Sequence, residues 1–192
     1  MRCLPHSVLG VTRCCGVAAF VRAAATHDCF VTAANSFGMM TAGIDAVLVH
    51  VHGQALMDRV QERIGLDFLG EQPVASCFII ETGTPGYPFV AHSPTMRVPS
   101  GIDGTDKVYV ATWAALVAIH RHNRGTGPRI RTVGMPAMGT GFGGVSFDEA
   151  ARQMACAWTN YVRPIDLGSG WDAVIERHRR LSYDGDVRVV PT

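Results

Sequence analysis

Residues 130–147 read I-R-T-V-G-M-P-A-M-G-T-G-F-G-G-V-S-F, and this stretch decides the fold. Residues 130–135 form an apolar run that predicts a buried strand, four glycines lie in a loop at residues 139–144, and a helix is predicted to open at Ser146. Such a loop lets backbone N–H groups approach a ligand, and a helix N-terminus adds partial positive charge. The unit therefore favours a phosphate or diphosphate ligand, although a glycine-rich turn without a ligand is the other interpretation.

A second strand-loop-helix unit lies in the first third of the chain. Residues 29–33 are β-prone, residues 34–38 contain the small polar residues of a loop, and apolar residues fall at helical spacing after Gly43. Two units of this kind can direct two loops toward one diphosphate.

The rest of the chain alternates between strand and helix patterns, which predicts an α/β layered domain. Ser146 and Glu149 have the spacing of a capping box, and Pro164 ends the helix that they begin. The other predicted elements are a buried strand at residues 74–80, a loop at residues 81–88, helices at residues 106–122 and 147–162, and an edge strand containing Val187, Val189 and Val190.

Composition points to an ordinary globular protein. The chain has 192 residues, of which 17% are charged, and its net charge of +1 gives no reason to expect nucleic acid or an anionic membrane as a partner. No apolar run reaches the roughly 20 residues that cross a bilayer. We expect one domain over residues 1–192, with a recognisable core at about residues 28–162 and a C-terminal extension at residues 165–192.

Cysteine and targeting signals favour a reduced, cytoplasmic protein. The six cysteines contain no C-x-x-C pair, and neither His nor Cys recurs at the spacing of metal ligands, so no metal site is predicted. Arg13 and Arg22 interrupt the apolar stretch near the N-terminus, which argues against a signal peptide.

Residues 139–144 also satisfy the dinucleotide-binding pattern G-x-G-x-x-G. That fingerprint should open a βαβ unit with an acidic residue about 20 positions further on, whereas here the helix runs into Pro164 and a polar tail. A Walker A loop is excluded because no Gly-Lys-Ser/Thr follows. A Rossmann-type NAD-binding protein therefore stays a minor alternative.

Three separate motifs resemble the macro domain family, and more narrowly a bacterial branch of it. They are A-N-S-F-G at residues 34–38 with G-I-D at residues 43–45, P-T-M-R-V-P at residues 94–99, and M-P-A-M-G-T-G at residues 135–141. The resemblance implies a three-layer α/β/α sandwich around a central mixed sheet and a cleft for ADP-ribose. In many members it also implies hydrolysis of ADP-ribose esters or glycosides. No cofactor is implied. The implied partner is ADP-ribose or an ADP-ribosylated macromolecule, which is a nucleic acid only if that is the modified substrate.

The resemblance also assigns site residues. Asn35 matches the asparagine that faces the distal ribose, and Asp45 matches a position that is acidic in several hydrolytic members, so these two are the predicted catalytic residues. The branch usually carries an acidic residue and a glycine where this chain has Thr41 and Ala42. The predicted ligand-binding residues are Ala34, Asn35, Ser36, Gly43, Ile44, Gly139, Thr140, Gly141, Phe142, Gly143 and Gly144.

Each predicted catalytic residue has a purely structural interpretation. A carboxylate in the first turn of a helix, such as Asp45, can act as a general base or only stabilise the helix dipole. Asn35 can hold a ribose hydroxyl or simply end a strand. Asp28 is expected to satisfy local backbone. The predicted function is an ADP-ribosyl hydrolase, with a non-catalytic ADP-ribose reader as the alternative.

Overall fold

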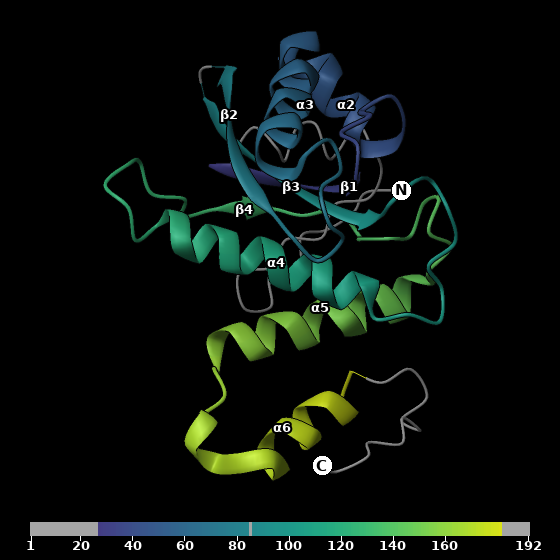
Figure 1. Ribbon diagram of the computed structural model, residues 1–192, viewed down its shortest axis with the longest axis vertical. Coiled ribbons are helices and arrows are strands. Elements are labelled where there is room, and N and C mark those ends of the chain that lie inside the picture. The colour runs from purple at the N-terminus through teal and green to yellow at the C-terminus, as the bar shows by residue number, and fades with distance from the viewer. Residues whose placement is uncertain (1–26, 85, 182–192) are drawn as a thin grey trace, which may run out of the picture.

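The computed structural model describes residues 27–84 and 86–181, and the predicted edge strand with Val187 lies outside them. A four-stranded mixed sheet in the order β2-β3-β1-β4 forms its centre (Figure 1). β1 pairs in parallel with β3 and with β4, while β2 is antiparallel to β3. The strands are β1 (Cys29–Asn35), β2 (Phe78–Thr84), β3 (Tyr87–Met96) and β4 (Val133–Gly134).

Helices cover both faces of the sheet, which confirms the predicted three-layer α/β/α sandwich. α2 and α3 lie on one face, α4 and α5 lie on the other, and α6 packs outside α5 (Figure 1). The helices are α2 (Gly43–His52), α3 (Gln54–Phe68), α4 (Lys107–His122), α5 (Phe147–Val162), the short 3-10 helix η1 (Leu167–Ser169) and α6 (Gly170–Arg179).

The central strand β1 divides its side chains between two cores, as the two-residue period of a strand requires. Cys29 and Val31 pack into the core under α4 and α5, whereas Phe30 packs into the core under α2 and α3. The next side chain on the α2 face is Thr32, which is buried and polar. The alternation thus brings a hydroxyl beneath the start of α2.

The strand before the glycine loop is shorter than predicted. The strand β4 contains only Val133–Gly134. Just before it, Thr132 O still accepts from Cys29 N–H at 3.2 Å, but the N–H groups of residues 131 and 132 bind the carboxylate of Asp28 instead of a strand.

Asp28 Oδ2 accepts from the N–H groups of Arg131 at 2.7 Å and Thr132 at 2.9 Å. The hydrogen bond from the backbone N–H of Arg131 is the main cause of the lowered pKa of Asp28. Asp28 was expected to satisfy local backbone. It does bind backbone N–H groups, but these lie on a neighbouring segment 103 and 104 residues further along the chain, so the prediction was right about the kind of partner and wrong about its location.

Two other segments differ from the sequence prediction. Residues 81–88 are not a loop, because β2 continues to Thr84 and β3 begins at Tyr87, with Gly83 and Gly86 at positive φ in the hairpin. The C-terminal extension contains α6, which the polar composition did not indicate. Within the described ranges no helix combines the length and apolarity needed to span a membrane.

Candidate functional site

Three loops meet at one edge of the sheet. β1, β3 and β4 run parallel, so the loops that follow them, residues 36–42, 97–106 and 135–146, leave from the same edge (Figure 1). Backbone hydrogen bonds join neighbours: Ser36 N–H donates to Arg97 O at 3.1 Å, and Ile102 N–H donates to Gly143 O at 2.8 Å. Ligands of open α/β sheets bind at such an edge.

The start of α2 is an uncapped helix terminus within this edge. Its N-cap is Ala42, which has no side chain that can accept a hydrogen bond. The backbone N–H groups of Gly43, Ile44 and Asp45 find no acceptor in the described part of the chain, and the first helical bond is donated by Ala46 to Ala42. Free N–H groups and the positive end of the helix dipole together form an anion-binding site.

Asp45 lies under this helix terminus and faces the sheet. It is only 5% exposed, and the hydroxyl of Thr32 donates a hydrogen bond to its Oδ1. Burial raises the pKa of Asp45 to about 7, while the bond from Thr32 opposes the rise. Near neutral pH the group is therefore divided between its acid and its base form, which is the condition that suits a general base.

Asn35 holds its own loop together. Its Nδ2 donates to Met39 O at 2.8 Å, and its Oδ1 accepts from the N–H groups of Phe37 at 3.0 Å and Met39 at 3.2 Å. Within the protein, Asn35 therefore acts as a residue that ends a strand and stabilises the loop after it. Its role toward a ribose stays a prediction.

Two other predicted contact residues of the first loop lie in the interior. Ala34 and Ser36 are buried, and the hydroxyl of Ser36 has no partner. The backbone of Ser36 is already engaged, since its N–H donates to Arg97 O and its carbonyl accepts from Gln72 N–H. Any contact of these two residues with a ligand would have to come from local movement, and it stays a prediction.

The glycine loop, residues 139–144, also has free backbone N–H groups, but they lie in a loop rather than at a helix start. Gly139 has a φ of 76° and Gly144 of 69°, a region that favours glycine. A Cβ at Gly143 would lie 2.3 Å from Gly139 O and 2.8 Å from Ile102 Cγ1, so only glycine fits there. The N–H groups of residues 141–143 have no acceptor in the described ranges, and Gly141 borders open space. The loop can therefore direct three amides toward an anion.

The helix after the glycine loop differs from the prediction. Ser146 Oγ accepts from Glu149 N–H at 3.2 Å, which confirms half of the capping box. The reciprocal bond is missing because the Glu149 carboxylate binds Arg152 and Gln153 instead, and the bond from Arg152 lowers the pKa of Glu149. With Asp148 and Glu149 in its first turn, the start of α5 is already neutralised, so the loop rather than this helix offers the anion site.

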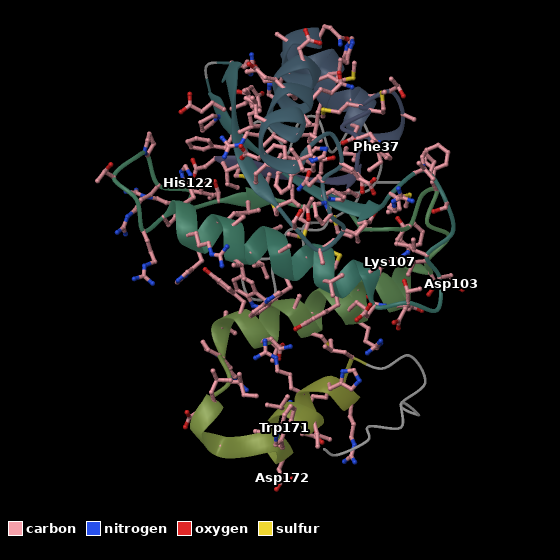
Figure 2. All side chains as sticks on the ribbon, in the orientation of Figure 1. Phe37, Asp103, Lys107, His122, Trp171 and Asp172 are labelled. Atoms are coloured by element: carbon pink, nitrogen blue, oxygen red, sulfur yellow. The ribbon has the colours of Figure 1, made fainter. Side chains whose placement is uncertain are left out.

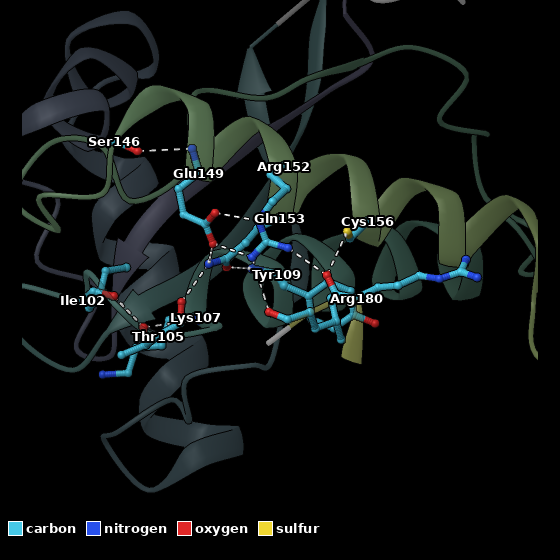
Figure 3. Close-up of polar contacts among 11 residues, drawn as sticks. Ile102, Thr105, Lys107, Tyr109, Ser146, Glu149, Arg152, Gln153, Cys156 and Arg180 are labelled. Atoms are coloured by element: carbon cyan, nitrogen blue, oxygen red, sulfur yellow. Dashed lines mark hydrogen bonds and ion pairs between the residues drawn. The ribbon is translucent and has the colours of Figure 1, made fainter. Parts of the chain in front are cut away.

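The side-chain amide of Gln153, which the sequence did not single out, joins α5 to the start of α4 (Figure 3). Gln153 Oε1 accepts from Tyr109 N–H at 2.8 Å, and its Nε2 donates to Thr105 O and Glu149 Oε1, each at 2.8 Å. The starts of α4 and α5 are thereby joined directly behind residues 97–106 and the glycine loop. The sequence signal that could have identified this residue is a glutamine on the core-facing side of a predicted helix.

The C-terminal extension is attached to the same network. Arg152 NH1 donates to the carbonyl of Arg180 at 2.8 Å, and its other groups bind Glu149 (Figure 3). The guanidinium of Arg177 lies 5.0 Å from the ring centroid of Trp113 on α4. α6 is therefore packed against the helices that follow two of the three loops.

Comparison with known proteins gives consistent matches. The sequence profile of the family described as Macro domain matches residues 31–154. An uncharacterized protein of Aquifex aeolicus is 32% identical over 127 residues, which cover 66% of this chain and 70% of that protein.

Solved structures show the same fold. The Oceanobacillus iheyensis macrodomain with ADP superposes with a TM-score of 0.61 at 20% identity, covering 73% of this chain and 72% of that one. The Trypanosoma brucei macrodomain in complex with ADP-ribose has a TM-score of 0.54 at 18% identity, covering 77% of this chain and 55% of that one.

Proposed function

This chain belongs to the macro domain family, and on this premise we propose that it binds ADP-ribose and hydrolyses the bond between ADP-ribose and a modified macromolecule. The observation that carries the proposal is the uncapped start of α2 at the same sheet edge as the free amides of residues 141–143. A diphosphate would accept hydrogen bonds from both sets of N–H groups. The complexes of the Trypanosoma brucei macrodomain with ADP-ribose and the Oceanobacillus iheyensis macrodomain with ADP support it.

In this proposal Asp45 is the general base. Its position in the first turn of α2 places the carboxyl directly beneath the N–H groups that would hold the diphosphate, and its pKa of about 7 suits proton transfer at neutral pH. The Asp45 carboxylate would accept a proton from an attacking water or orient a ribose hydroxyl as positive charge develops at the anomeric carbon. Thr32 would hold that carboxylate in place through its hydrogen bond.

Other predicted residues complete the proposed site. Asn35 would keep the first loop in its binding shape and offer its amide to the distal ribose, with Phe142 beside the same sugar. Gly43 and Ile44 would contact the diphosphate through their backbone, and Gly139, Thr140, Gly141, Gly143 and Gly144 would form the opposite wall. No cofactor takes part.

A reader that binds ADP-ribose without hydrolysis is the second candidate, and the burial of Asp45 favours it, since a carboxyl that is 5% exposed has limited access to water. The Rossmann alternative loses its support, because the sheet is mixed and no strand follows α5 within the described residues. The two remaining candidates make the same prediction for binding and opposite predictions for turnover.

Calorimetric titration with ADP-ribose tests binding, with NAD as the competing ligand. Turnover is then measured on substrates that carry ADP-ribose on a carboxylate ester, arginine, serine or nucleobase. We expect saturable ADP-ribose binding and turnover that falls about 10²–10⁴-fold in Asp45→Asn. The matched control Asp58→Asn, an exposed acid on α3, should leave both unchanged.

The outcomes separate the candidates. Binding without turnover of any linkage by the intact protein would leave the reader. Equal turnover by Asp45→Asn would remove Asp45 from the mechanism. Absence of ADP-ribose binding at millimolar concentration would overturn the proposal as a whole.

A further inference from the structure

Ile102, in the segment 97–106, packs against the glycine loop at two positions. Its side chain is buried, and a Cβ on Gly139 would lie 3.0 Å from Ile102 Cδ1, while one on Gly143 would lie 2.8 Å from Ile102 Cγ1. The N–H of Ile102 also donates to Gly143 O at 2.8 Å. The loop with the free N–H groups of residues 141–143 is therefore supported by a single residue of the neighbouring segment.

Thr105 holds the backbone of Ile102. Its hydroxyl donates to Ile102 O at 2.6 Å and accepts from Lys107 N–H at 3.4 Å. Figure 2 shows Lys107 and Asp103 beside the start of α4, where the segment 97–106 enters the helix. Both polar backbone atoms of Ile102 are thus hydrogen-bonded, the carbonyl to Thr105 and the N–H to the glycine loop.

Gln153 connects this segment to α5. Its side chain is 1% exposed, and its Nε2 donates to Thr105 O at 2.8 Å while its Oε1 accepts from Tyr109 N–H at 2.8 Å (Figure 3). A side-chain amide can bind a carbonyl and an N–H at once, because it carries both a donor and an acceptor. A continuous series of hydrogen bonds therefore leads from Gln153 through Thr105 and Ile102 to the glycine loop.

Glu149 fixes which way the Gln153 amide faces. Gln153 Nε2 donates to Glu149 Oε1 at 2.8 Å, and the two oxygens of that carboxylate accept from Arg152 at 2.6 Å each. An ionised carboxylate only accepts hydrogen bonds, so the atom of Gln153 that faces it must be the nitrogen. The donor of Gln153 is thereby directed at Thr105 O and its acceptor at α4.

Resting on the proposed function, we propose that Gln153 is a positioning residue that sets the affinity for ADP-ribose by holding the glycine loop in its binding shape through Thr105 and Ile102. The loop has four glycines in residues 139–144, whose backbone is conformationally permissive, so contacts from outside the loop must fix its shape. A loop that adopts the binding shape only part of the time binds more weakly in proportion to that fraction.

Calorimetric titration of Gln153→Met with ADP-ribose tests this inference. Methionine keeps the length of the side chain and removes its donor and acceptor. We expect the dissociation constant to rise about tenfold, as for a loop that is in its binding shape about a tenth of the time, at the stoichiometry of the intact protein. A general loss of folded protein would instead lower the stoichiometry and leave the dissociation constant unchanged.

Asn123 provides the matched control, because its side-chain amide also binds one backbone N–H and one carbonyl. Its Nδ2 donates to Ile130 O and its Oδ1 accepts from Ile130 N–H, each at 2.8 Å. Asn123 follows His122, and Figure 2 shows His122 and Lys107 at opposite ends of α4. Asn123→Leu should therefore lower the unfolding temperature but change the dissociation constant for ADP-ribose less than about twofold.

Thr105 variants test the next contact and serve if Gln153→Met does not fold. Thr105→Val loses the hydroxyl that donates to Ile102 O and should weaken ADP-ribose binding about fivefold, whereas Thr105→Ser keeps a hydroxyl and should restore binding to within about twofold. Combining Thr105→Val with Gln153→Met should weaken binding by less than the product of the two separate effects, because both substitutions interrupt one series of contacts.

Three outcomes would overturn the inference. They are an unchanged dissociation constant in both Gln153→Met and Thr105→Val, an equal loss of affinity in Asn123→Leu, and a Thr105→Ser protein that binds as weakly as Thr105→Val. In each of these cases the intact protein still binds ADP-ribose. Absence of ADP-ribose binding by the intact protein would instead contradict the proposed function.

Discussion

The two strand-loop-helix units use their helix starts in opposite ways. α2 begins after Ala42 without a side-chain cap and leaves three N–H groups free, whereas α5 begins at Ser146 with a capped turn that contains Asp148 and Glu149. The loop before α5 instead offers its own backbone amides. Similar sequence patterns have therefore produced one proposed anion site made by a helix start and another made by a loop.

The carboxyl groups in the first turns of α2 and α5 also differ, in burial and in pKa. Asp45 is buried and its pKa is raised to about 7 by burial, whereas hydrogen bonding to Arg152 lowers the pKa of Glu149. A neutral Asp45 does not cancel the positive end of α2, while an ionised Glu149 helps to cancel that of α5. The start of α2 is thus less stabilised than the start of α5, which fits the proposal that only the start of α2 receives an anion.

The largest expected effect is on the pH dependence of stability. The pKa of Asp45 lies above its ordinary value of 3.8, because the folded state favours the protonated carboxyl. The contribution of Asp45 to folding stability is therefore fully present below about pH 4 and is lost as the pH rises through about 7. A rise of roughly 3 pK units corresponds to about 4 kcal/mol. Asp45→Asn should remove this loss and raise the free energy of unfolding at pH 8 by up to about that amount.

Chemical unfolding at several pH values measures this effect, with Glu149→Gln as the comparison. The pKa of Glu149 is lowered, so its contribution should be present above its ordinary pKa of 4.5 and lost as the pH falls through the folded value. The two variants should therefore change the pH profile with opposite signs. An Asp45→Asn protein that is less stable than the original at pH 8 would show that the helix start stabilises the carboxylate.

The second prediction concerns a substitution that adds a side-chain cap to α2, like the cap that α5 has. Ala42→Asp should cap α2 and raise the free energy of unfolding by about 0.5–2 kcal/mol. The same carboxylate would occupy the free N–H groups and repel the diphosphate, so ADP-ribose affinity should fall about 100-fold, which is about 2.7 kcal/mol.

Two further substitutions separate charge from capping. Ala42→Asn caps without charge and should reduce ADP-ribose affinity less than Ala42→Asp. Ser146→Asp adds charge at a start that already has a cap and should change affinity little. Calorimetry and thermal unfolding on each variant provide the readout, and unchanged affinity in Ala42→Asp would place the diphosphate away from α2.

The sequence predicted the layered α/β fold because its helices and parallel strands have local periods and strong boundaries. α5 was predicted with its observed bounds, since Ser146 and Pro164 mark its ends chemically. The hairpin of β2 and β3 was missed because glycine and proline usually mark loops. Here Gly83 lies inside β2, where the pairing register shifts, and Gly86 lies in the short turn that leads into β3.

The positions of the two candidate loops were predictable from the sequence, whereas the environments of their charged groups were not. The positions of the two loops follow from the strand-loop-helix patterns. The burial of Asp45 against Thr32, 13 residues earlier, depends on how α2 packs on the sheet, and no local pattern encodes it. The carboxylate of Glu149 likewise binds Arg152 and Gln153 rather than closing the capping box, and the packing of the folded chain decides between these partners.

The third prediction distinguishes two glycines of the loop. From the sequence alone, a bulky residue at Gly141 or Gly143 should abolish binding and leave the fold intact, but the structure separates the two positions. A Cβ at Gly143 would meet Gly139 O at 2.3 Å, whereas at Gly141 nothing lies within 4 Å. Gly143→Ala should therefore cost about 1–3 kcal/mol of stability.

Gly141→Val is the matched change that should leave stability nearly unchanged and remove ADP-ribose binding, because its side chain would occupy the space before the loop amides. Thermal unfolding and calorimetry again give both values. Equal stability of the two variants would contradict the packing of the loop against Ile102.

The smallest effect is expected at the cap of α5. Ser146→Ala removes the acceptor of Glu149 N–H and should lower the free energy of unfolding by about 1 kcal/mol. ADP-ribose affinity should change less than twofold, because this helix start is not the anion site and its N–H groups serve the fold alone. Denaturant unfolding and calorimetry measure the two quantities side by side. If Ser146→Ala instead weakened ADP-ribose binding tenfold at constant stability, both helix starts would contribute to the ligand site, and the division of roles between α2 and α5 would be wrong.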